Sequence, residues 1–407
     1  MKISKLARSV NESPTLQLNA IAKKMIAEGK PVINLGVGEP DNPAPEGAVE
    51  AAQRKLKEGK IKYVPTAGML SLREAIADYT FENYQENVAV ENIVVSTGAK
   101  QALFNILFVL IDPGDEVLLL APYWVSYPEM VRMVGGVPVV VHPSAGSFTP
   151  DFDSIRNAVT QKTKAVIVNS PSNPSGGVYS EEFVSQLVAL CEEREIAYIA
   201  DDIYQKLVFD GVEASPAFKF TDLDIENAPI IIVNGIAKSF GMTGFRIGWA
   251  VTNKEAANMM TRAQSQITSC ASVISQAAAE GALRKSGGEV ERLRKEIQAN
   301  RDVAVKEIGE ITQLELTAPQ GTFYAFPKVN AHSHLSYKIS ELLLQKGMVS
   351  TVPGEPFGLE GHIRISFSGP SGVVSEGIRR IKWVLDENGS AEYDLGNGEK
   401  LKRDWKN

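Results

Sequence analysis

Asn234-Gly-Ile-Ala-Lys-Ser-Phe-Gly-Met-Thr-Gly-Phe-Arg-Ile-Gly-Trp249 is the stretch of sequence that decides the fold. A β-branched run, Ile230-Ile-Ile-Val233, precedes it, and an apolar run, Ile247-Gly-Trp-Ala-Val251, overlaps its end. The pattern therefore predicts a loop between two buried strands. Lys238 lies in that loop, where an amine without a carboxylate partner either has a lowered pKa or forms an imine with a carbonyl compound. Arg246 adds a planar cation suited to phosphate.

The composition of the chain is that of an ordinary globular protein. Of the 407 residues 44% are hydrophobic and 22% are charged, which allows one large α/β domain with a smaller appendage. A net charge of −7 gives no basic surface for nucleic acid. No apolar run is long enough to span a membrane, and Met1-Lys-Ile-Ser-Lys5 is not followed by the apolar core of a signal peptide. We therefore expect a soluble cytoplasmic protein that binds neither nucleic acid nor membrane.

Cysteine and histidine residues give no sign of a metal site. Cys191 and Cys270 lie in apolar, helix-like contexts and read as reduced thiols of the core. His332 and His334 form a close pair, but no cysteine or acidic residue lies nearby at ligand spacing. The sequence therefore predicts that no metal is bound.

A second candidate anion site follows the predicted strand Ile93–Val95. Ser96-Thr-Gly-Ala99 is a turn of small residues, and an apolar helix follows it over Lys100–Leu110. Such a turn presents free N–H groups at the positive end of the helix dipole. Together with Arg246, it predicts a phosphate site.

Charged residues also appear at the ends or in the middle of apolar strands. Asp201 ends the run Ile196–Ala200, where a carboxylate is poorly solvated and needs a cationic partner such as a protonated pyridine ring. Arg364 alternates with Ile363 and Ile365, and an arginine in an apolar strand usually binds an anion or pairs with an Asp or Glu side chain.

These motifs together resemble those of the class I, fold-type I aminotransferases, which bind pyridoxal 5'-phosphate. The lysine segment reads Gly235-Ile-Ala-Lys238 with Arg246-Ile-Gly248, and Asn173-Pro-Ser-Gly176 resembles the family's Asn-Pro-Thr-Gly turn. Asp201-Asp-Ile-Tyr204 resembles Asp-Glu-Val/Ile-Tyr, with Asp202 in place of Glu, and His362-Ile-Arg-Ile-Ser366 resembles the family's arginine segment. The resemblance runs from about Leu18 to Leu385.

The resemblance implies an α/β fold in which helices flank a mixed, mostly parallel sheet, with a smaller α+β domain beside it. We expect an extended N-terminal arm over residues 1–17 and a large cofactor-binding domain over 46–305. The small domain would combine 18–45 with 306–385, and a polar tail would follow over 386–407. This tail lies beyond what the family pattern explains.

The resemblance also implies the roles of individual residues. Lys238 would hold the cofactor and move the substrate proton, Asp201 would support the pyridine nitrogen, and Tyr204 would hold the phenolic oxygen. The other predicted cofactor-binding residues are Gly98, Ala99, Lys100, Trp124, Asn173, Arg246 and Tyr63. The predicted substrate-binding residues are Gly38, Lys100, Trp124, Asn173 and Arg364, the last for the α-carboxylate. Tyr63 would reach the cofactor phosphate of the neighbouring subunit, which implies a homodimer with shared active sites.

One departure concerns the phosphate site. Many members of the family have a phosphate-binding serine where this chain has Gly235. The site is thus short of one hydroxyl, and Ser96 and Thr97 are the candidate replacements.

Substrate choice depends on Lys100. Gly98-Ala-Lys100-Gln101 resembles the Gly-Gly-Lys-Gln segment of the subgroup that acts on aspartate and glutamate, and Ser13-Pro-Thr15 resembles its Ser-x-Thr segment. Ping-pong transfer from aspartate to 2-oxoglutarate is therefore the leading hypothesis. An aromatic or prephenate-type aminotransferase and a carbon–sulfur β-lyase remain alternatives. A cofactor-sensing regulator is the least favoured alternative, because the arm before Leu18 is too short for a helix-turn-helix.

Overall fold

A seven-stranded sheet forms the centre of the molecule in the computed structural model, which describes residues 1–10, 14–330, 335–396 and 398–405. The strand order is β2-β8-β7-β6-β5-β3-β4. Only β8 runs antiparallel to its neighbours, and the other pairs are parallel. The strands are β2 (Ile93–Ser96), β3 (Glu116–Leu120), β4 (Val137–Val141), β5 (Thr163–Val168), β6 (Ala197–Asp201), β7 (Ile230–Gly235) and β8 (Gly248–Val251). The predicted α/β class with a mixed, mostly parallel sheet is confirmed.

Both faces of this sheet are buried, because alternate residues of each strand enter different cores. Ile230 and Ile232 of β7 belong to the core on one face, whereas Ile231 and Val233 belong to the core on the other. The first core is closed by α4 (Leu70–Tyr84), α7 (Phe152–Ala158), α8 (Glu181–Arg194) and α10 (Val273–Lys285). The second core is closed by α5 (Ala99–Leu110), α6 (Tyr127–Met133) and α9 (Lys254–Ile267). In addition, α3 (Glu46–Lys57) packs on α10, where Gly47 and Gly281 let the two backbones approach closely.

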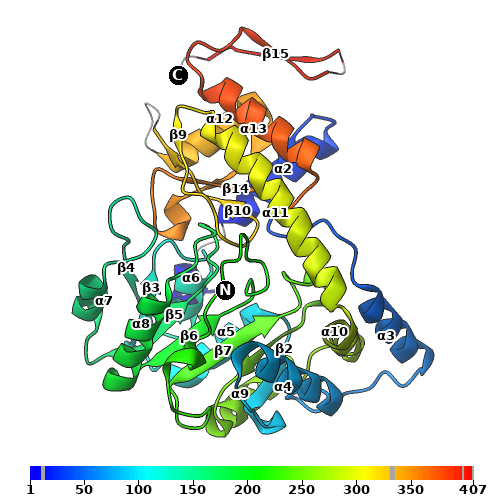
Figure 1. The fold of residues 1–407 in the computed structure, drawn as a ribbon, viewed down its shortest axis with the longest axis vertical. Coiled ribbons are helices and arrows are strands. Elements are labelled where there is room, and N and C mark those ends of the chain that lie inside the picture. Colours follow the sequence, from blue (N-terminus) through cyan, green and yellow to red (C-terminus); the bar gives the residue numbers. More distant parts are fainter. Residues whose placement is uncertain (11–13, 331–334, 397, 406–407) are drawn as a thin grey trace.

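The long helix α11 (Gly287–Gly309) runs from this sheet unit into the upper part of the molecule, as Figure 1 shows. There a separate core lies between α11, α12 (Ser336–Gly347) and α13 (Ser371–Leu385). The short strands of the upper part are β1 (Ile33–Asn34), β9 (Leu314–Glu315), β10 (Tyr324–Ala325), β11 (Lys328–Val329), β12 (Val349–Ser350), β13 (Val352–Pro353) and β14 (Ile363–Ser366). The β1 strand pairs in parallel with β12, and β14 lies between β10 and β13. Within the described residues, 3₁₀ segments η1 to η4 occupy Val90–Asn92, Ala217–Phe220, Thr243–Phe245 and Glu355–Phe357.

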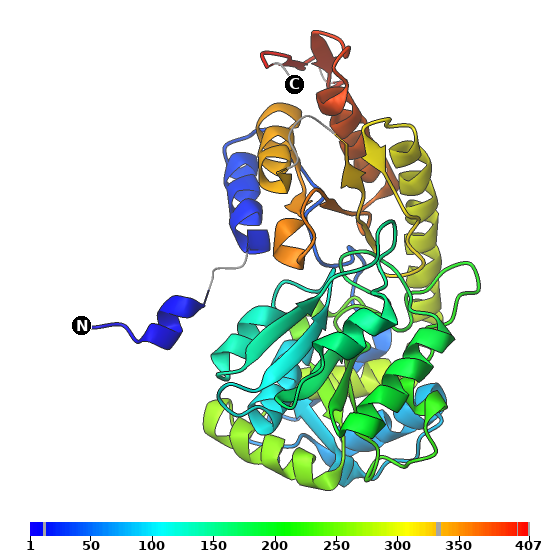
Figure 2. The same cartoon turned by 90° about the vertical axis from the view of Figure 1, so that its left-hand side faces the viewer.

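The two ends of the chain differ from expectation. A short helix, α1 (Lys5–Ser9), interrupts the arm that we expected to be extended, and Figure 2 shows it standing away from the body. The α2 helix (Pro14–Ala27) begins four residues earlier than Leu18, because proline is well tolerated in the first turn of a helix. The predicted tail folds into a hairpin of β15 (Glu392–Asp394) and β16 (Lys400–Lys402).

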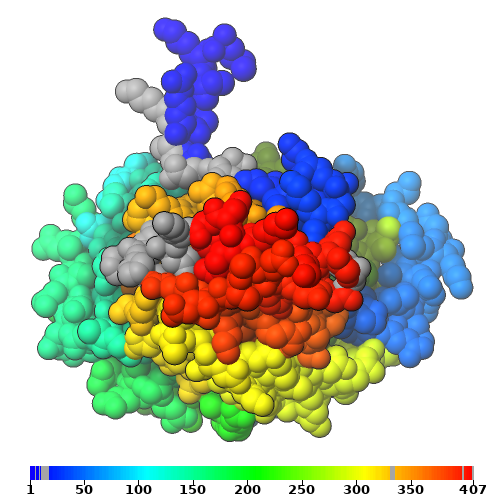
Figure 3. All heavy atoms as spheres, turned by 90° about the horizontal axis from the view of Figure 1, so that it is seen from above, coloured from blue at the N-terminus to red at the C-terminus, as the bar shows by residue number. Residues whose placement is uncertain are grey.

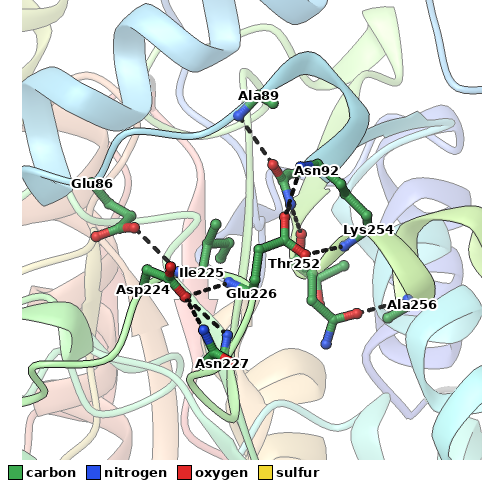
Figure 4. Close-up of polar contacts among 11 residues, drawn as sticks. Glu86, Ala89, Asn92, Asp224, Ile225, Glu226, Asn227, Thr252, Lys254 and Ala256 are labelled. Atoms are coloured by element: carbon green, nitrogen blue, oxygen red, sulfur yellow. Dashed lines mark hydrogen bonds and ion pairs between the residues drawn. The ribbon is translucent and has the colours of Figure 1, made fainter.

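A hydrogen-bonded clamp fixes the edge of the sheet at β2 and β8 (Figure 4). The Asn92 amide, just before β2, donates to Glu226 Oε1 at 2.7 Å and to the Thr252 carbonyl at 2.9 Å. Its Oδ1 accepts from the Ala89 N–H at 3.0 Å, and Glu226 Oε2 accepts from the Lys254 N–H at 3.2 Å. The clamp therefore joins the start of β2 to the end of β8 and holds the register that places Ser96 opposite Gly248.

The helices give no indication of a membrane span. Within the described parts of the chain, no helix has both the length and the apolar character needed to cross a bilayer.

Candidate active site

The candidate site is a cavity of about 400 Å³ at the carboxyl edge of the sheet. Successive strands deliver its residues: Lys100 follows β2, Trp124 follows β3, Asn173 follows β5, Asp201 ends β6 and Lys238 follows β7. In open α/β sheets this edge is the usual place for a ligand. The cavity is lined by the predicted residues Gly38, Ala99, Lys100, Trp124, Asn173, Asp201, Tyr204, Lys238, Arg246 and Arg364.

A larger cavity of about 490 Å³ lies beside α11. Its described lining includes no lysine, histidine or tyrosine, and its charged side chains are those of Asp41, Glu289, Arg292 and Glu296. Because lysine and tyrosine side chains, which can serve as nucleophiles and proton carriers, line the cavity of about 400 Å³ and are absent from the described lining of the other, we take the cavity at the carboxyl edge of the sheet as the candidate site.

Lys238 extends from the loop after β7 toward the segment that follows β1. Its Nζ donates to the Gly38 carbonyl at 2.5 Å. Burial, with nearby Arg364 as the next cause, lowers the pKa of Lys238 from 10.5 to about 8. A sizeable fraction of the amine is therefore neutral and nucleophilic near neutral pH.

Asp201 is a buried carboxylate with one oxygen left open. Tyr127 donates its hydroxyl to Asp201 Oδ2 at 2.5 Å, whereas no donor among the described residues reaches Oδ1. Burial raises the pKa of Asp201 to about 6, although the bonds from Tyr127 and from the Ile203 backbone act in the opposite direction. A buried acceptor without a donor is costly. The N–H of a protonated pyridine ring would satisfy Oδ1, so this residue fits pyridoxal 5'-phosphate.

The predicted phosphate end lies where the turn after β2 meets Arg246. Gly98 has φ +84°, and a Cβ there would lie 2.6 Å from Arg246 Nη2, so only glycine lets the guanidinium pack on the turn. A side chain at Gly235 would meet the Ile247 carbonyl at 2.8 Å, which explains why this chain has no serine there. Ser96 and Thr97 were the candidates to supply the missing phosphate-binding hydroxyl. The Ser96 hydroxyl is already hydrogen-bonded, because it donates to Gln264 Oε1 at 2.6 Å.

Arg364 of β14 also lines the cavity and is only 4% exposed. Its guanidinium donates to Asn173 Oδ1 at 2.9 Å and to the Gly36 carbonyl at 3.0 Å. It also lies over the Tyr324 ring at 4.2 Å. No carboxylate among the described residues forms an ion pair with Arg364, so it can bind an anionic ligand.

Lys100 and Trp124 lie together in the cavity wall. Lys100 Nζ lies 4.7 Å from the centre of the Trp124 ring. Desolvation, followed by repulsion from Arg246, lowers the pKa of Lys100. Both effects would be offset by a carboxylate beside it.

Some predicted residues do not meet in this cavity. Gly98 packs against the Arg246 guanidinium and does not line the cavity. Tyr63 lies in the loop between α3 and α4, is 89% exposed, and does not line the cavity either. Ser13 of the Ser13–Thr15 segment and the pair His332 and His334 lie outside the described residues. Among the residues that are described, no three His, Cys, Asp or Glu side chains gather as metal ligands would.

Tyr127, Asn169 and Tyr324 are among the side chains of the site that sequence reasoning missed. Tyr127 holds Asp201, and Asn169 donates to the Asp201 carbonyl at 2.7 Å while accepting from the Asn173 N–H at 2.8 Å. Tyr324 places its hydroxyl 3.4 Å from that of Tyr204. Asn169 directly follows β5, and this strand-end position was the available signal for it.

Comparisons with known proteins agree with this geometry. Residues 30–381 match a family model described as aminotransferase class I and II. A protein of Aquifex aeolicus named probable aspartate/prephenate aminotransferase is 41% identical over 382 residues, which cover 92% of this chain and 96% of that protein.

Solved structures give the same result. The aspartate aminotransferase from Thermus thermophilus with maleate has a TM-score of 0.90 and 37% identity, and the match covers 95% of this chain and 100% of that one. The aspartate aminotransferase from Thermotoga maritima has a TM-score of 0.88 and 35% identity, and the match covers 93% of this chain and 99% of that chain.

Proposed function

Because this chain belongs to the class I and II aminotransferases, we propose that its cavity binds pyridoxal 5'-phosphate and transfers the amino group of aspartate to 2-oxoglutarate. The family depends on this cofactor in general, and its members act on an amino acid and a 2-oxo acid. One observation carries the proposal for this chain. A lysine with a lowered pKa and a buried carboxylate oxygen without a donor line the same cavity.

The cofactor-holding groups divide between the two ends of the cavity. Arg246 and the N–H groups at the start of α5 would bind the phosphate. Asn173 and Tyr204 would hold the phenolic oxygen, and Asp201 Oδ1 would hold the proton on the ring nitrogen. When bound, the pyridoxal group supplies an electron sink for the bond broken at the substrate α-carbon.

The remaining steps fall to the side chains of this chain. Arg364 would bind the α-carboxylate of the amino acid, with the Gly38 backbone close to it. Lys238 Nζ, freed by the incoming amine, would take the proton from the α-carbon as a general base and return it as a general acid. The Trp124 ring, partly buried at the cavity wall, would exclude water from one face of the reacting group. A second 2-oxo acid then reverses the sequence.

The acidic substrate is assigned through Lys100. Its ammonium has no carboxylate partner among the described residues, and its lowered pKa reflects an environment that an anion would improve. Relatives named aspartate aminotransferase and aspartate/prephenate aminotransferase support the same substrate class.

Replacing Lys100 by alanine should lower kcat/KM for aspartate by one to two orders of magnitude. The change removes a charge-assisted contact worth about 1.5–3 kcal/mol. The loss for alanine or phenylalanine should be much smaller, and steady-state kinetics on the three amino acids measures the difference. An equal loss on all three would exclude the specificity role and leave the amino transfer itself untouched.

Product analysis separates the proposed reaction from the alternatives. Amino transfer to prephenate at a rate comparable with that to 2-oxoglutarate would favour the aromatic or prephenate-type enzyme. Pyruvate release from cysteine conjugates without a 2-oxo acid would favour the β-lyase.

We also propose a homodimer with shared active sites. Tyr63 is almost fully exposed and has no place in the cavity of its own subunit. In a two-fold symmetric pair, the same loop of each subunit can reach the phosphate end of the other.

Mixing Tyr63→Phe subunits with Lys238→Ala subunits tests this arrangement. One site of a mixed dimer would carry both changes and the other neither, so activity should recover toward half of the wild-type value per mixed dimer. Assays before and after subunit exchange measure it, with each variant alone as the control. Absence of recovery despite exchange would contradict shared sites.

A further inference from the structure

The C-terminal tail lies beyond residue 381, where the match to the family model ends. Its hairpin pairs β15 with β16, and Tyr393 lies opposite Leu401. In Figure 1 the hairpin lies above α12 and α13, and in Figure 3 the red tail extends across the top of the molecule. The hairpin thus covers the small upper core on the side away from the sheet.

Aromatic contacts attach the tail to the last turn of α13. The Trp383 indole N–H donates to the Ser390 carbonyl at 2.9 Å, and the Tyr393 ring lies 5.5 Å from the Trp383 ring. Trp405 meets Trp383 edge-on at 5.1 Å, and the Arg403 guanidinium lies over both indoles. These contacts leave Trp383 only 6% exposed.

A chain of charged hydrogen bonds leads from the tail to the start of β1. The Tyr393 hydroxyl donates to Glu376 Oε2 at 3.1 Å, and Arg380 Nε donates to Glu376 Oε1 at 2.8 Å. Arg380 Nη1 then donates to the Pro31 carbonyl at 2.7 Å. Arg380 is only 5% exposed, so its orientation depends on the carboxylate beside it.

The segment that begins at Pro31 continues into the candidate active site. Within residues 31–38, the Ile33 and Leu35 N–H groups donate to the backbone of residues 348 and 350. Beyond β1, the carbonyls of Gly36 and Gly38 accept from Arg364 and Lys238. Arg380 therefore holds the start of a segment whose other end contacts Arg364, the predicted carboxylate-binding residue, and Lys238, the predicted catalytic lysine.

We propose that the C-terminal tail is a positioning element, in which Tyr393 fixes Glu376, Glu376 orients Arg380, and Arg380 sets the start of the segment 31–38 that lines the cavity. The proposal rests on the proposed function only in treating this segment as part of the substrate site. The tail itself contacts neither substrate nor cofactor.

Hydrogen–deuterium exchange of residues 31–38 tests the coupling without any assay of activity. In Tyr393→Phe the ring stays against Trp383 and only the hydroxyl is lost, so exchange in this segment should be about three- to tenfold faster, as expected for one hydrogen bond. Glu376→Gln should accelerate it further, because a buried arginine loses its carboxylate. The matched control is Glu392→Gln, which breaks only the surface pair with Lys400 and should leave the exchange of residues 31–38 unchanged.

The double variant Tyr393→Phe/Glu376→Gln decides whether the contacts act in series. If Tyr393 acts through Glu376, the double variant should exchange no faster than Glu376→Gln alone. Unchanged exchange in Tyr393→Phe, additive effects in the double variant, or faster exchange spread evenly over the whole chain would each overturn the proposal.

Kinetics supply the functional readout. In Tyr393→Phe the KM for aspartate should rise about two- to fivefold while kcat and the cofactor absorbance stay at wild-type values, because substrate seating changes and the chemical step does not. An unchanged KM together with a lowered kcat would contradict the positioning role. If the wild-type protein does not use aspartate, the proposed function fails, and the exchange experiment still decides the inference about the tail.

Discussion

The Lys238→Ala variant should lose about four orders of magnitude of aminotransferase activity while keeping its fold. Lys238 is the lysine in the cavity whose pKa is lowered to about 8 by burial and Arg364. Its removal deletes both the covalent attachment of the cofactor and the group that moves the α-proton, and general acid–base catalysis alone contributes about 10²–10⁴-fold. Single-turnover kinetics with saturating cofactor measures the loss.

Borohydride reduction of the cofactor-loaded protein identifies the lysine directly. The wild-type protein should carry the label on the peptide that contains Lys238, and Lys238→Ala should carry none. Lys100→Ala is the matched control, because it removes the neighbouring lysine of the same cavity and should be labelled as the wild type is. Label on any other lysine would refute the assignment.

Because the pKa of Lys238 is lowered, the covalent attachment of the cofactor to this lysine should depend on pH. Only the neutral amine attacks a carbonyl group, so the cofactor-free protein should bind the cofactor covalently faster as the pH rises from 6 through about 8, and the rate should level off above that. Stopped-flow absorbance over this range measures the midpoint.

Strand ends were the part of the site that could be predicted from sequence. The buried runs before Asn173, Asp201 and Lys238 mark strands by their apolar, β-branched composition, and a polar residue at the end of such a run needs a special partner. Parallel strands carry these ends to one edge of the sheet, so distant residues meet in one cavity. The start of α2 at Pro14 could have been read in the same local way, from the place of proline in the first turn.

Contacts between distant segments could not be predicted. Tyr127 and Asp201 are 74 residues apart, and Tyr204 and Tyr324 are 120 apart, so no local pattern reports their pairing. The reason for Gly235 could not be predicted either. The missing hydroxyl is visible in the sequence, whereas the carbonyl that would clash with a side chain there belongs to Ile247, directly before β8, which pairs with β7. The tail hairpin depends likewise on Trp383, since a six-residue strand pair is marginal in water without a surface to cover.

Asp201→Asn should lower kcat by about two to three orders of magnitude and yet make the cofactor-free protein more stable near neutral pH. Asparagine can still accept from Tyr127, but it cannot hold a proton on the ring nitrogen by charge, and removing one such electrostatic partner typically costs about 10²–10³-fold.

The gain in stability follows from the raised pKa of Asp201. The pKa of this carboxyl is 3.8 when unperturbed, and burial raises it to about 6 in the folded chain. Between these values the folded state binds more protons than the unfolded state, so stability falls as the pH rises through this window. Above about pH 6 the buried carboxylate then costs the cofactor-free protein about 2–3 kcal/mol, a cost that asparagine does not carry. Thermal unfolding of both cofactor-free proteins should therefore coincide near pH 4 and differ by a few degrees at pH 7.5, with the variant higher. Equal unfolding temperatures at pH 7.5 would mean that Asp201 finds a donor in the cofactor-free protein, and its open oxygen would then no longer argue for a pyridine ring.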